Sequence, residues 1–338
     1  MEQQLVAWIR EHLPSHERLL IGPGDDAAVL AMAGDDHLNP DLLLRDADLA
    51  MYRAKQQGGH RFEVFDRNME VHVSDLRERE RELRRVLDKH EFEFWHQPIF
   101  RLATGQVEGF ESLLRWRRAD GSYESFRDLL AIAEDTGLSI SIGRDTLDAA
   151  WRQLQLWEKT IPGNSIMVTV NVTHRQFYHE DVVATLQQVL ASGSGNPSRL
   201  LLEVSESVLN EHPDRAVAIL QRVSDCGVRV AMDDFGAHLA PLNHLLRLPI
   251  EIVKMTPQMT IAATGNGRQL AMVQSLIHVC KAVGVQVLAQ GIETKEQIKA
   301  LHALGCELGQ GNLLSPALDA PHAQQLASRL HRNVNFQP

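Results

Sequence analysis

The feature that most constrains the fold is an alternation of short apolar runs with amphipathic stretches from about residue 91 onward. The runs that read as strands are EFEFWHQPIF, QVEGFESLLRW, SIMVTVNV, LLLEVSES, VRVAMDDFG, EIVKMT, QVLAQGIE and the segment after Cys306. Strands that alternate with helices usually pair in parallel, and eight such units close into a barrel. The sequence therefore predicts an α/β fold built as a (β/α)8 barrel.

Glycine and proline punctuate the stretches between these strands, and three helices are expected to stop just before a glycine. They cover residues 126–135, 214–225 and 269–283. The first two strands are separated only by a short turn at Thr104 and Gly105, which indicates an antiparallel hairpin. We therefore expect a modified TIM-type barrel with an antiparallel first strand.

Composition restricts the classes of partner. The 338-residue chain has a net charge of −10, which disfavours nucleic-acid polymers. It has no apolar run near the roughly 20 residues of a spanning helix and no signal-like start, so we expect no membrane segment and a cytoplasmic location. The three cysteines are widely separated and odd in number, which argues against a disulfide framework.

Polar residues recur where the predicted strands end. They are Glu111, Asn171, Glu203, Glu206, Asp233, Asp234, Lys254, Gln290, Glu293 and Gln310. A barrel brings the carboxyl ends of its parallel strands to one mouth, which is where active sites lie in this fold. One strand-end carboxylate is most often simply solvated, but polar residues from seven strands are better explained by a shared site.

These side chains carry enough oxygen donors for a hard cation. The adjacent carboxylates Asp233 and Asp234 are favourable in a confined site only with a cation, and Glu111, Asn171 and Glu203 add ligands for one or two Mg²⁺ or Mn²⁺ ions. Two such ions can hold a phosphodiester and activate a water molecule for attack on phosphorus. Lys254 can hold that water or neutralise the phosphate, although a surface lysine after an apolar strand is an equally good interpretation.

Several motifs in register then resemble one family. ESLLRW, NVT, LLEVSES, MDDFG, EIVKM, GIET and GCELGQG occur in the order found in EAL-domain cyclic di-GMP phosphodiesterases, from about Leu76 to the end. The resemblance implies a barrel that binds cyclic di-GMP and, when fully equipped, opens it to pGpG with Mg²⁺ or Mn²⁺. It also leaves open a homodimer or a signalling-protein partner.

The resemblance assigns roles residue by residue. The implied metal ligands are Glu111, Asn171, Glu203, Asp233 and Asp234. The implied nucleotide contacts are Gln97 of HQP, Arg115 of LLRW and Gln310, the last of which also matches a metal-organising position. The implied catalytic positions are Lys254, Gln290 and Glu293.

Three departures from the family pattern bear on activity. Where the family reads AEGVET, this chain reads AQGIET, and Gln290 cannot accept a proton at neutral pH. The family's KID becomes Lys254-Met255-Thr256, which removes a second carboxylate. The loop that usually reads DDFGTGYSSL is DDFGAHLAPL here, with changes at Ala237, His238 and Pro241, in a segment associated with metal assembly and dimer contacts in the family.

The upstream residues resemble pieces of other families. Residues 41–75 resemble the C-terminal end of a GGDEF diguanylate-cyclase domain without its signature, and IGPGDDAAVL resembles the start of thiamine-monophosphate kinases. A solvent-exposed turn is the favoured interpretation for Asp25 and Asp26. We therefore expect a short segment over 1–40, a GGDEF remnant over 41–75 (together a small N-terminal α/β fragment) and an EAL domain over 76–338.

Two functions remain open from the sequence. The favoured one is a degenerate EAL domain that binds cyclic di-GMP with weak or no hydrolysis and acts in cyclic di-GMP signalling. The alternative is an active metal-dependent phosphodiesterase that converts cyclic di-GMP to pGpG. Residue 290 discriminates between them, because loss of a general base there removes stabilisation of the transition state. Each tenfold loss in rate corresponds to about 1.4 kcal/mol of that stabilisation.

Overall fold

The computed structural model describes residues 79–332, except 90, 119–120, 126–129, 131, 135, 162, 180 and 237–243, together with two short N-terminal strands. The chain divides into two compact units, 1–83 and 84–338. In the first unit, β1 (Leu19–Gly22) pairs antiparallel with β2 (Val29–Met32). The predicted turn at Asp25 and Asp26, the GGDEF-like stretch 41–75 and the altered loop residues Ala237, His238 and Pro241 lie outside the described residues.

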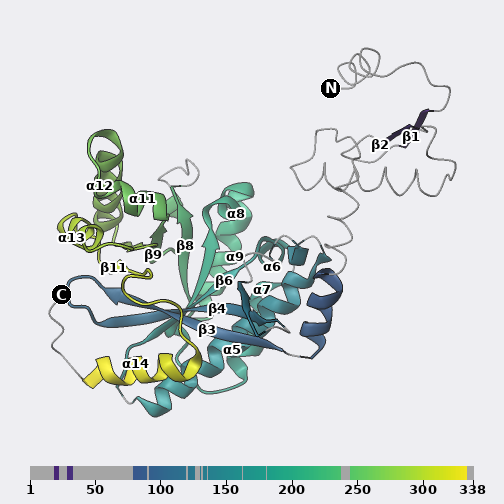
Figure 1. The fold of residues 1–338 in the computed structure, drawn as a ribbon, viewed down its shortest axis with the longest axis horizontal. Coiled ribbons are helices and arrows are strands. Elements are labelled where there is room, and N and C mark those ends of the chain that lie inside the picture. The colour runs from purple at the N-terminus through teal and green to yellow at the C-terminus, as the bar shows by residue number, and fades with distance from the viewer. Residues whose placement is uncertain are drawn as a thin grey trace. The chain divides into compact units, whose positions relative to one another are not determined.

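The second unit is built on a closed barrel of eight strands (Figure 1). These strands are β3 (Phe92–Arg101), β4 (Val107–Arg117), β6 (Met167–Val172), β7 (Leu200–Ser205), β8 (Arg229–Phe235), β9 (Ile252–Met255), β10 (Gln286–Ala289) and β11 (Leu308–Gly309). The barrel closes because β3 pairs with both β4 and β11. All eight predicted strands are confirmed.

The first strand runs against its neighbours, as predicted. β3 and β4 form an antiparallel hairpin with Gln97 opposite Glu111, and the turn between them places Gly105 at a φ of 69°. β3 is also antiparallel to β11, whereas the remaining barrel strands pair in parallel. A short extra strand, β5 (Tyr123–Ser125), pairs with the end of β4.

Helices connect the strands and cover the barrel's outer face. They are α5 (Leu138–Thr160), α6 (His174–Tyr178), α7 (Val182–Ala191), α8 (Glu206–Glu211), α9 (Pro213–Asp225), α10 (His244–Arg247), α11 (Pro257–Ala262), α12 (Gly267–Ala282), α13 (Lys295–Ala303) and α14 (Ala320–Arg332), with a 3₁₀ turn over Pro197–Arg199. The helices predicted over 214–225 and 269–283 are confirmed as α9 and α12. The one predicted over 126–135 falls partly outside the described residues.

Local sequence explains where several helices begin. Thr173 and Thr294 cap α6 and α13 through capping boxes that each use a glutamine three residues later. Asp181 caps α7 by accepting a hydrogen bond from the Ala184 amide. None of the helices in the described part of the chain combines the length and apolar character that crossing a bilayer requires.

Side chains point alternately outward and inward along the strands, which gives the barrel two separate apolar cores. Outward residues such as Val168 and Val170 of β6 pack with Trp151 and Trp157 of α5. Inward residues close the bottom of the barrel with a separate apolar layer, formed by Ile99, Met167, Leu201, Ala231, Ile252, Leu288 and Leu308. The next inward positions toward the carboxyl ends of the parallel strands are mostly polar, and this layer contains the candidate site.

One outward residue of β3 is polar and buried. His96 is 1% exposed, its ring meets Trp157 edge-on with centroids 5.5 Å apart, and its Nδ1 atom has no hydrogen-bond partner. Its backbone bridges to Leu318, the residue shortly before α14. Burial lowers the pKa of His96 to about 4, so protonation works against this packing.

We therefore predict that His96 makes the protein sensitive to mild acid. Because its pKa is lower in the folded than in the unfolded chain, stability is lost as pH falls from about 6.5 toward 4, by about 3 kcal/mol from this group. In urea unfolding at a series of pH values, His96→Phe should flatten that slope. The exposed His278→Gln should not, and an unchanged slope in His96→Phe would contradict the assignment.

Candidate functional site

The polar layer is organised around one buried ammonium group. Lys254 of β9 is 0% exposed, and its Nζ atom donates to Glu203 Oε2 at 2.5 Å and to Glu111 Oε2 at 3.0 Å. Asp233 Oδ1 lies 3.8 Å from the same nitrogen. Four strands, β4, β7, β8 and β9, thus bring three carboxylates to one lysine, and the surface interpretation of Lys254 is wrong.

Neutral amides complete this group of side chains, which we call the Lys254 cluster. Asn171 Nδ2 donates to Glu111 Oε1 at 2.9 Å, and Gln310 Nε2 donates to Glu111 Oε2 at 2.7 Å. Gln290 Nε2 donates to Asp233 Oδ1 at 2.8 Å. The cluster consists of Glu111, Asn171, Glu203, Asp233, Lys254, Gln290 and Gln310.

Burial and pairing act differently on the two glutamates. Burial alone would raise the pKa of Glu111, but the Lys254 charge and the hydrogen bonds from Gln310 and Asn171 lower it to about 2. Burial and the neighbouring charge of Glu111 raise the pKa of Glu203 to about 8, despite its contact with Lys254. Burial works against the Lys254 charge, but Asp233, Glu111 and Glu203 together raise the pKa of Lys254. The cluster thus holds more negative charge than its single cation balances.

That excess fits a divalent cation. Glu203 Oε1 and Gln310 Oε1 are buried acceptors with no hydrogen-bond partner, and such atoms ordinarily meet a water molecule or an ion. The available donors are carboxylate and amide oxygens, which suit Mg²⁺ and Mn²⁺. Within the described ranges, no group of three or more His, Cys, Asp or Glu side chains is arranged to hold a metal ion. The Lys254 ammonium lies among the carboxylates instead.

The adjacent Asp233 and Asp234 do not occupy equivalent places. Asp233 is 8% exposed and belongs to the cluster, whereas Asp234 is exposed and has a φ of 54°, which is unusual for a residue other than glycine. The register of β8 against β9 also shifts between Met232 and Phe235, so the regular strand geometry is interrupted at this point. A strained backbone of this kind is often found at functional sites.

Other predicted residues lie farther out. Glu293 is exposed, and its backbone N–H donates to Gln297 Oε1 at 2.7 Å, so the structure does not bring its carboxylate into the cluster. Gln97 of β3 lies opposite Glu111 on the same face of the hairpin, and its amide reaches the Ser315 carbonyl at 3.5 Å. Arg115 follows Glu111 by four residues on β4, so it lies on the same face of the strand, toward the rim of the mouth.

Two features of the mouth were not given a role by the sequence. Glu206 is 1% exposed, and its Oε2 accepts a hydrogen bond from the Gly236 amide at 2.9 Å, so it fixes the backbone just after β8. Glu93 and Trp95 share the inward face of β3 with Gln97. The period-two spacing within FEFWHQP was the signal that could have placed them there.

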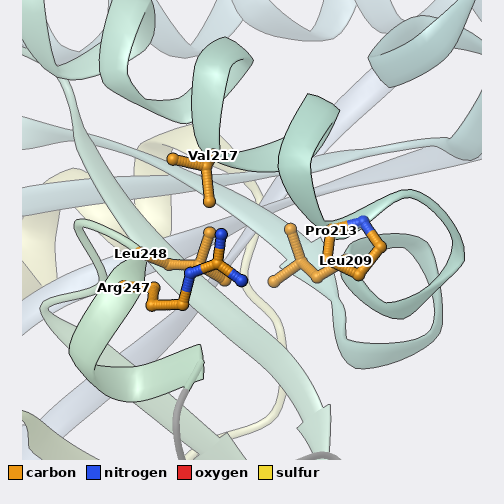
Figure 2. A pocket seen from close by; sticks show the side chains of 5 residues that line it. All are labelled: Leu209, Pro213, Val217, Arg247 and Leu248. Atoms are coloured by element: carbon orange, nitrogen blue, oxygen red, sulfur yellow. The ribbon is translucent and has the colours of Figure 1, made fainter.

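Two pockets lie elsewhere. Figure 2 shows the first, between α8, α9 and α10, where Arg247 and apolar side chains meet. The second, of about 480 Å³, is lined by residues of α6, α7 and α9 and by the segment that joins α6 to α7. Neither includes a member of the Lys254 cluster.

Comparison with known proteins agrees with this geometry. The EAL domain family matches residues 80–317. An uncharacterised signalling protein of Caulobacter vibrioides is 32% identical over 277 residues, which cover 82% of this chain and 34% of that protein. The bifunctional diguanylate cyclase/cyclic di-GMP phosphodiesterase MucR of Pseudomonas aeruginosa is 32% identical over 297 residues, covering 87% and 42%.

Solved structures show the same fold. The structure of the PaMucR phosphodiesterase in a c-di-GMP complex has a TM-score of 0.69 and 31% identity, and the match covers 72% of this chain and 98% of that one. The chain belongs to the EAL domain family, and it spans less than half the length of the curated relatives described above.

The Lys254 cluster predicts a metal-sensitive stability. Lys254→Met leaves three buried carboxylates without their cation and should lower the free energy of unfolding by about 3–5 kcal/mol. Mn²⁺ should restore part of that loss, because it replaces the missing positive charge. Thermal and urea unfolding with EDTA or Mn²⁺ would measure both effects.

Lys299→Met is the matched control, because Lys299 is exposed in the middle of α13. It should change stability little with or without metal. Equal stability of Lys254→Met and the unmodified protein in EDTA would contradict the central role of the lysine.

Proposed function

We propose that this chain is a degenerate EAL domain that binds cyclic di-GMP with weak or no hydrolysis and acts in cyclic di-GMP signalling. The observation that carries the proposal is the contact of Gln290 with Asp233, 2.8 Å from amide nitrogen to carboxylate oxygen. A glutamine at this position donates a hydrogen bond but cannot take a proton from water at neutral pH. Hydrolysis therefore lacks one of the groups that the family resemblance implies.

The same contact also weakens the site's hold on metal. The hydrogen bond that Asp233 accepts from Gln290 satisfies an oxygen that a cation would otherwise coordinate. A carboxylate at 290 would instead add negative charge beside Asp233 and increase the attraction for a divalent ion. We infer that the glutamine both removes a base and lowers metal affinity.

The remaining ligand set still suits Mg²⁺ or Mn²⁺. Glu111, Asn171, Glu203, Asp233 and Asp234 would hold one or two ions. When bound, such ions neutralise a phosphodiester and make a water molecule more acidic. Lys254 holds Glu111 and Glu203 in place, Gln310 holds Glu111, and Glu293 stays a proposed outer catalytic residue.

Thr256 has a structural role at the start of α11. Thr256 caps α11 by accepting a hydrogen bond from the Met259 amide at 3.4 Å, and it is 6% exposed. Aspartate caps helices as well as threonine does, so Thr256→Asp can restore the family carboxylate without breaking the cap. The carboxylate missing from the Lys254-Met255-Thr256 segment can thus be restored by a single substitution.

Binding requires less of the site than catalysis does. A phosphodiester can be held by charge and hydrogen bonds even where proton transfer is lost. Support comes from the related PaMucR phosphodiesterase, whose structure contains c-di-GMP. In this chain Gln97 and Arg115 stay on the wall of the mouth, and Arg115 can form a charge-assisted fork to a phosphate.

We predict that Gln290→Glu raises hydrolysis. The unmodified protein should release little pGpG from cyclic di-GMP with Mn²⁺, and the variant should release at least about tenfold more, a difference of about 1.4 kcal/mol in barrier. Adding Thr256→Asp should increase turnover further. Chromatography of the nucleotide products measures both steps.

A second readout separates metal binding from chemistry. In EDTA, Gln290→Glu should be less stable than the unmodified protein because two carboxylates then face each other, and Mn²⁺ should reverse that loss. Gln187→Glu, on an exposed face of α7, is the control and should alter neither property. Brisk hydrolysis by the unmodified protein would establish the alternative function, an active metal-dependent phosphodiesterase.

The alternative has one observation in its favour. The implied ligands Glu111, Asn171, Glu203 and Asp233 remain together around Lys254 despite the change at 290. An ordered water beside such ligands can react slowly without a dedicated base. The turnover assay on the unmodified protein therefore decides between the two functions.

We predict that binding depends on Arg115 more than on Gln290. Cyclic di-GMP should bind in the micromolar range or tighter, about −8 kcal/mol. Arg115→Ala should weaken binding more than Gln290→Ala, because it removes a charged contact to phosphate. Calorimetry with and without Mg²⁺ measures this. Equal losses would contradict the separation of binding from chemistry, and no saturable heat would indicate a protein-interaction module instead.

A further inference from the structure

The hairpin wall of the mouth carries an aromatic pair held by one carboxylate. The rings of Trp95 on β3 and Tyr123 on β5 have centroids 5.0 Å apart and are tilted by 54°. Glu93 accepts a hydrogen bond from the Tyr123 hydroxyl at 3.1 Å and one from Trp95 Nε1 at 3.4 Å. Three residues from two separate strands thus form one unit, which we call the aromatic wall.

Strand register places this wall beside the candidate site. Trp95 lies opposite Leu113, and the next pair on the same face toward the bottom of the barrel is Gln97 with Glu111. Because alternate residues share a face, Glu93, Trp95 and Gln97 follow one another inward from the rim. The aromatic wall therefore continues the surface that leads to the Lys254 cluster.

Arg115 joins the wall to the phosphate-binding chemistry. Its guanidinium carbon lies 5.9 Å from the Trp95 ring centroid, and its Nη1 donates to the Leu114 carbonyl at 3.0 Å. A guanidinium at this distance from an indole is stabilised by the ring and loses side-chain freedom. Trp95 thus helps to hold Arg115 at the rim.

The exposure of the wall sets it apart from the other tryptophans of the described residues. Trp116, Trp151 and Trp157 are each 1% exposed, whereas Trp95 is only partly buried and Tyr123 is 41% exposed. Large rings that stay accessible beside a polar site are well suited to stack on a flat ligand. A nucleobase is such a ligand, and its stacking on aromatic side chains does not depend on a particular hydrogen-bond pattern.

We propose that the aromatic wall stacks on a purine base of the bound nucleotide while Arg115 contacts the adjoining phosphate. This rests on the proposed function and extends it by assigning recognition of the base to Trp95, with Tyr123 and Glu93 as positioning residues. The ligand class is a purine nucleotide phosphodiester whose ring lies against the β3–β4–β5 wall. Its charged part then faces the Lys254 cluster.

Cross-strand packing is the competing explanation for the same contacts, because aromatic pairs also stabilise hairpins. A packing role affects unfolding but not the optical response of Trp95 to a ligand. The test therefore needs a binding measurement, a stability measurement and the fluorescence of this one tryptophan.

The experiment titrates the full chain in EDTA with cyclic di-GMP by calorimetry and by tryptophan fluorescence. Trp95→Ala should weaken binding about tenfold, as loss of one base stack does, and Trp95→Phe should stay within about threefold of the unmodified protein. The unmodified protein should lose fluorescence on binding. Trp95→Phe should bind with that change largely absent. Leu156→Ala, which alters a 47%-exposed apolar residue of α5, is the control and should alter neither signal.

Each remaining outcome has a defined meaning. Normal binding by Trp95→Ala, or an unchanged fluorescence response in Trp95→Phe, overturns this inference while leaving the proposed function intact. Trp95→Ala could also bind weakly only because its melting temperature is lower. If it then binds normally in a titration well below that melting temperature, the inference is overturned. Absence of binding by the unmodified protein, both in EDTA and with Mg²⁺, overturns the proposed function and this inference together.

Discussion

The buried ammonium of Lys254 is the interaction on which the site depends. It is 0% exposed and lies among three carboxylates that come from three other strands. Without a cation, these carboxylates would repel one another in a region where water cannot screen them. The lysine thus stabilises the polar layer above the apolar layer of the barrel, and it donates to Glu111, the carboxylate that Gln310 and Asn171 also contact.

Much of this arrangement could be predicted from sequence because it follows from periodicity. Asn171, Glu203 and Asp233 stand near the carboxyl ends of their strands, and a barrel brings those ends together. Glu111 lies inside β4 rather than at its end, but it belongs to the same inward-facing layer. The pairing of Gln290 with Asp233 could not be predicted, because it depends on the side-chain conformation of the residue just after β10. The sequence also treated Asp233 and Asp234 alike, whereas Asp233 is buried in the cluster and Asp234 is exposed. Trp95 was hidden in a run that reads simply as apolar strand.

In the proposed function, binding and chemistry use different parts of one surface. The cluster at the bottom of the mouth controls charge and water, whereas the wall formed by β3, β4 and β5 presents Gln97, Arg115 and aromatic rings. A change at residue 290 alters the first part without touching the second. This separation gives a physical route by which an EAL domain can lose turnover and keep a ligand.

The closure of the barrel has a consequence for the site. β11 contains only Leu308 and Gly309, and it joins β10 to β3. The residues that flank this short strand continue the pairing, because the Leu102 amide donates to the Glu307 carbonyl at 2.9 Å and the Gln310 amide donates to the Ala289 carbonyl at 2.9 Å. The side chain of the same Gln310 donates to Glu111. One residue therefore serves both the joint that completes the barrel and the charged group at its mouth.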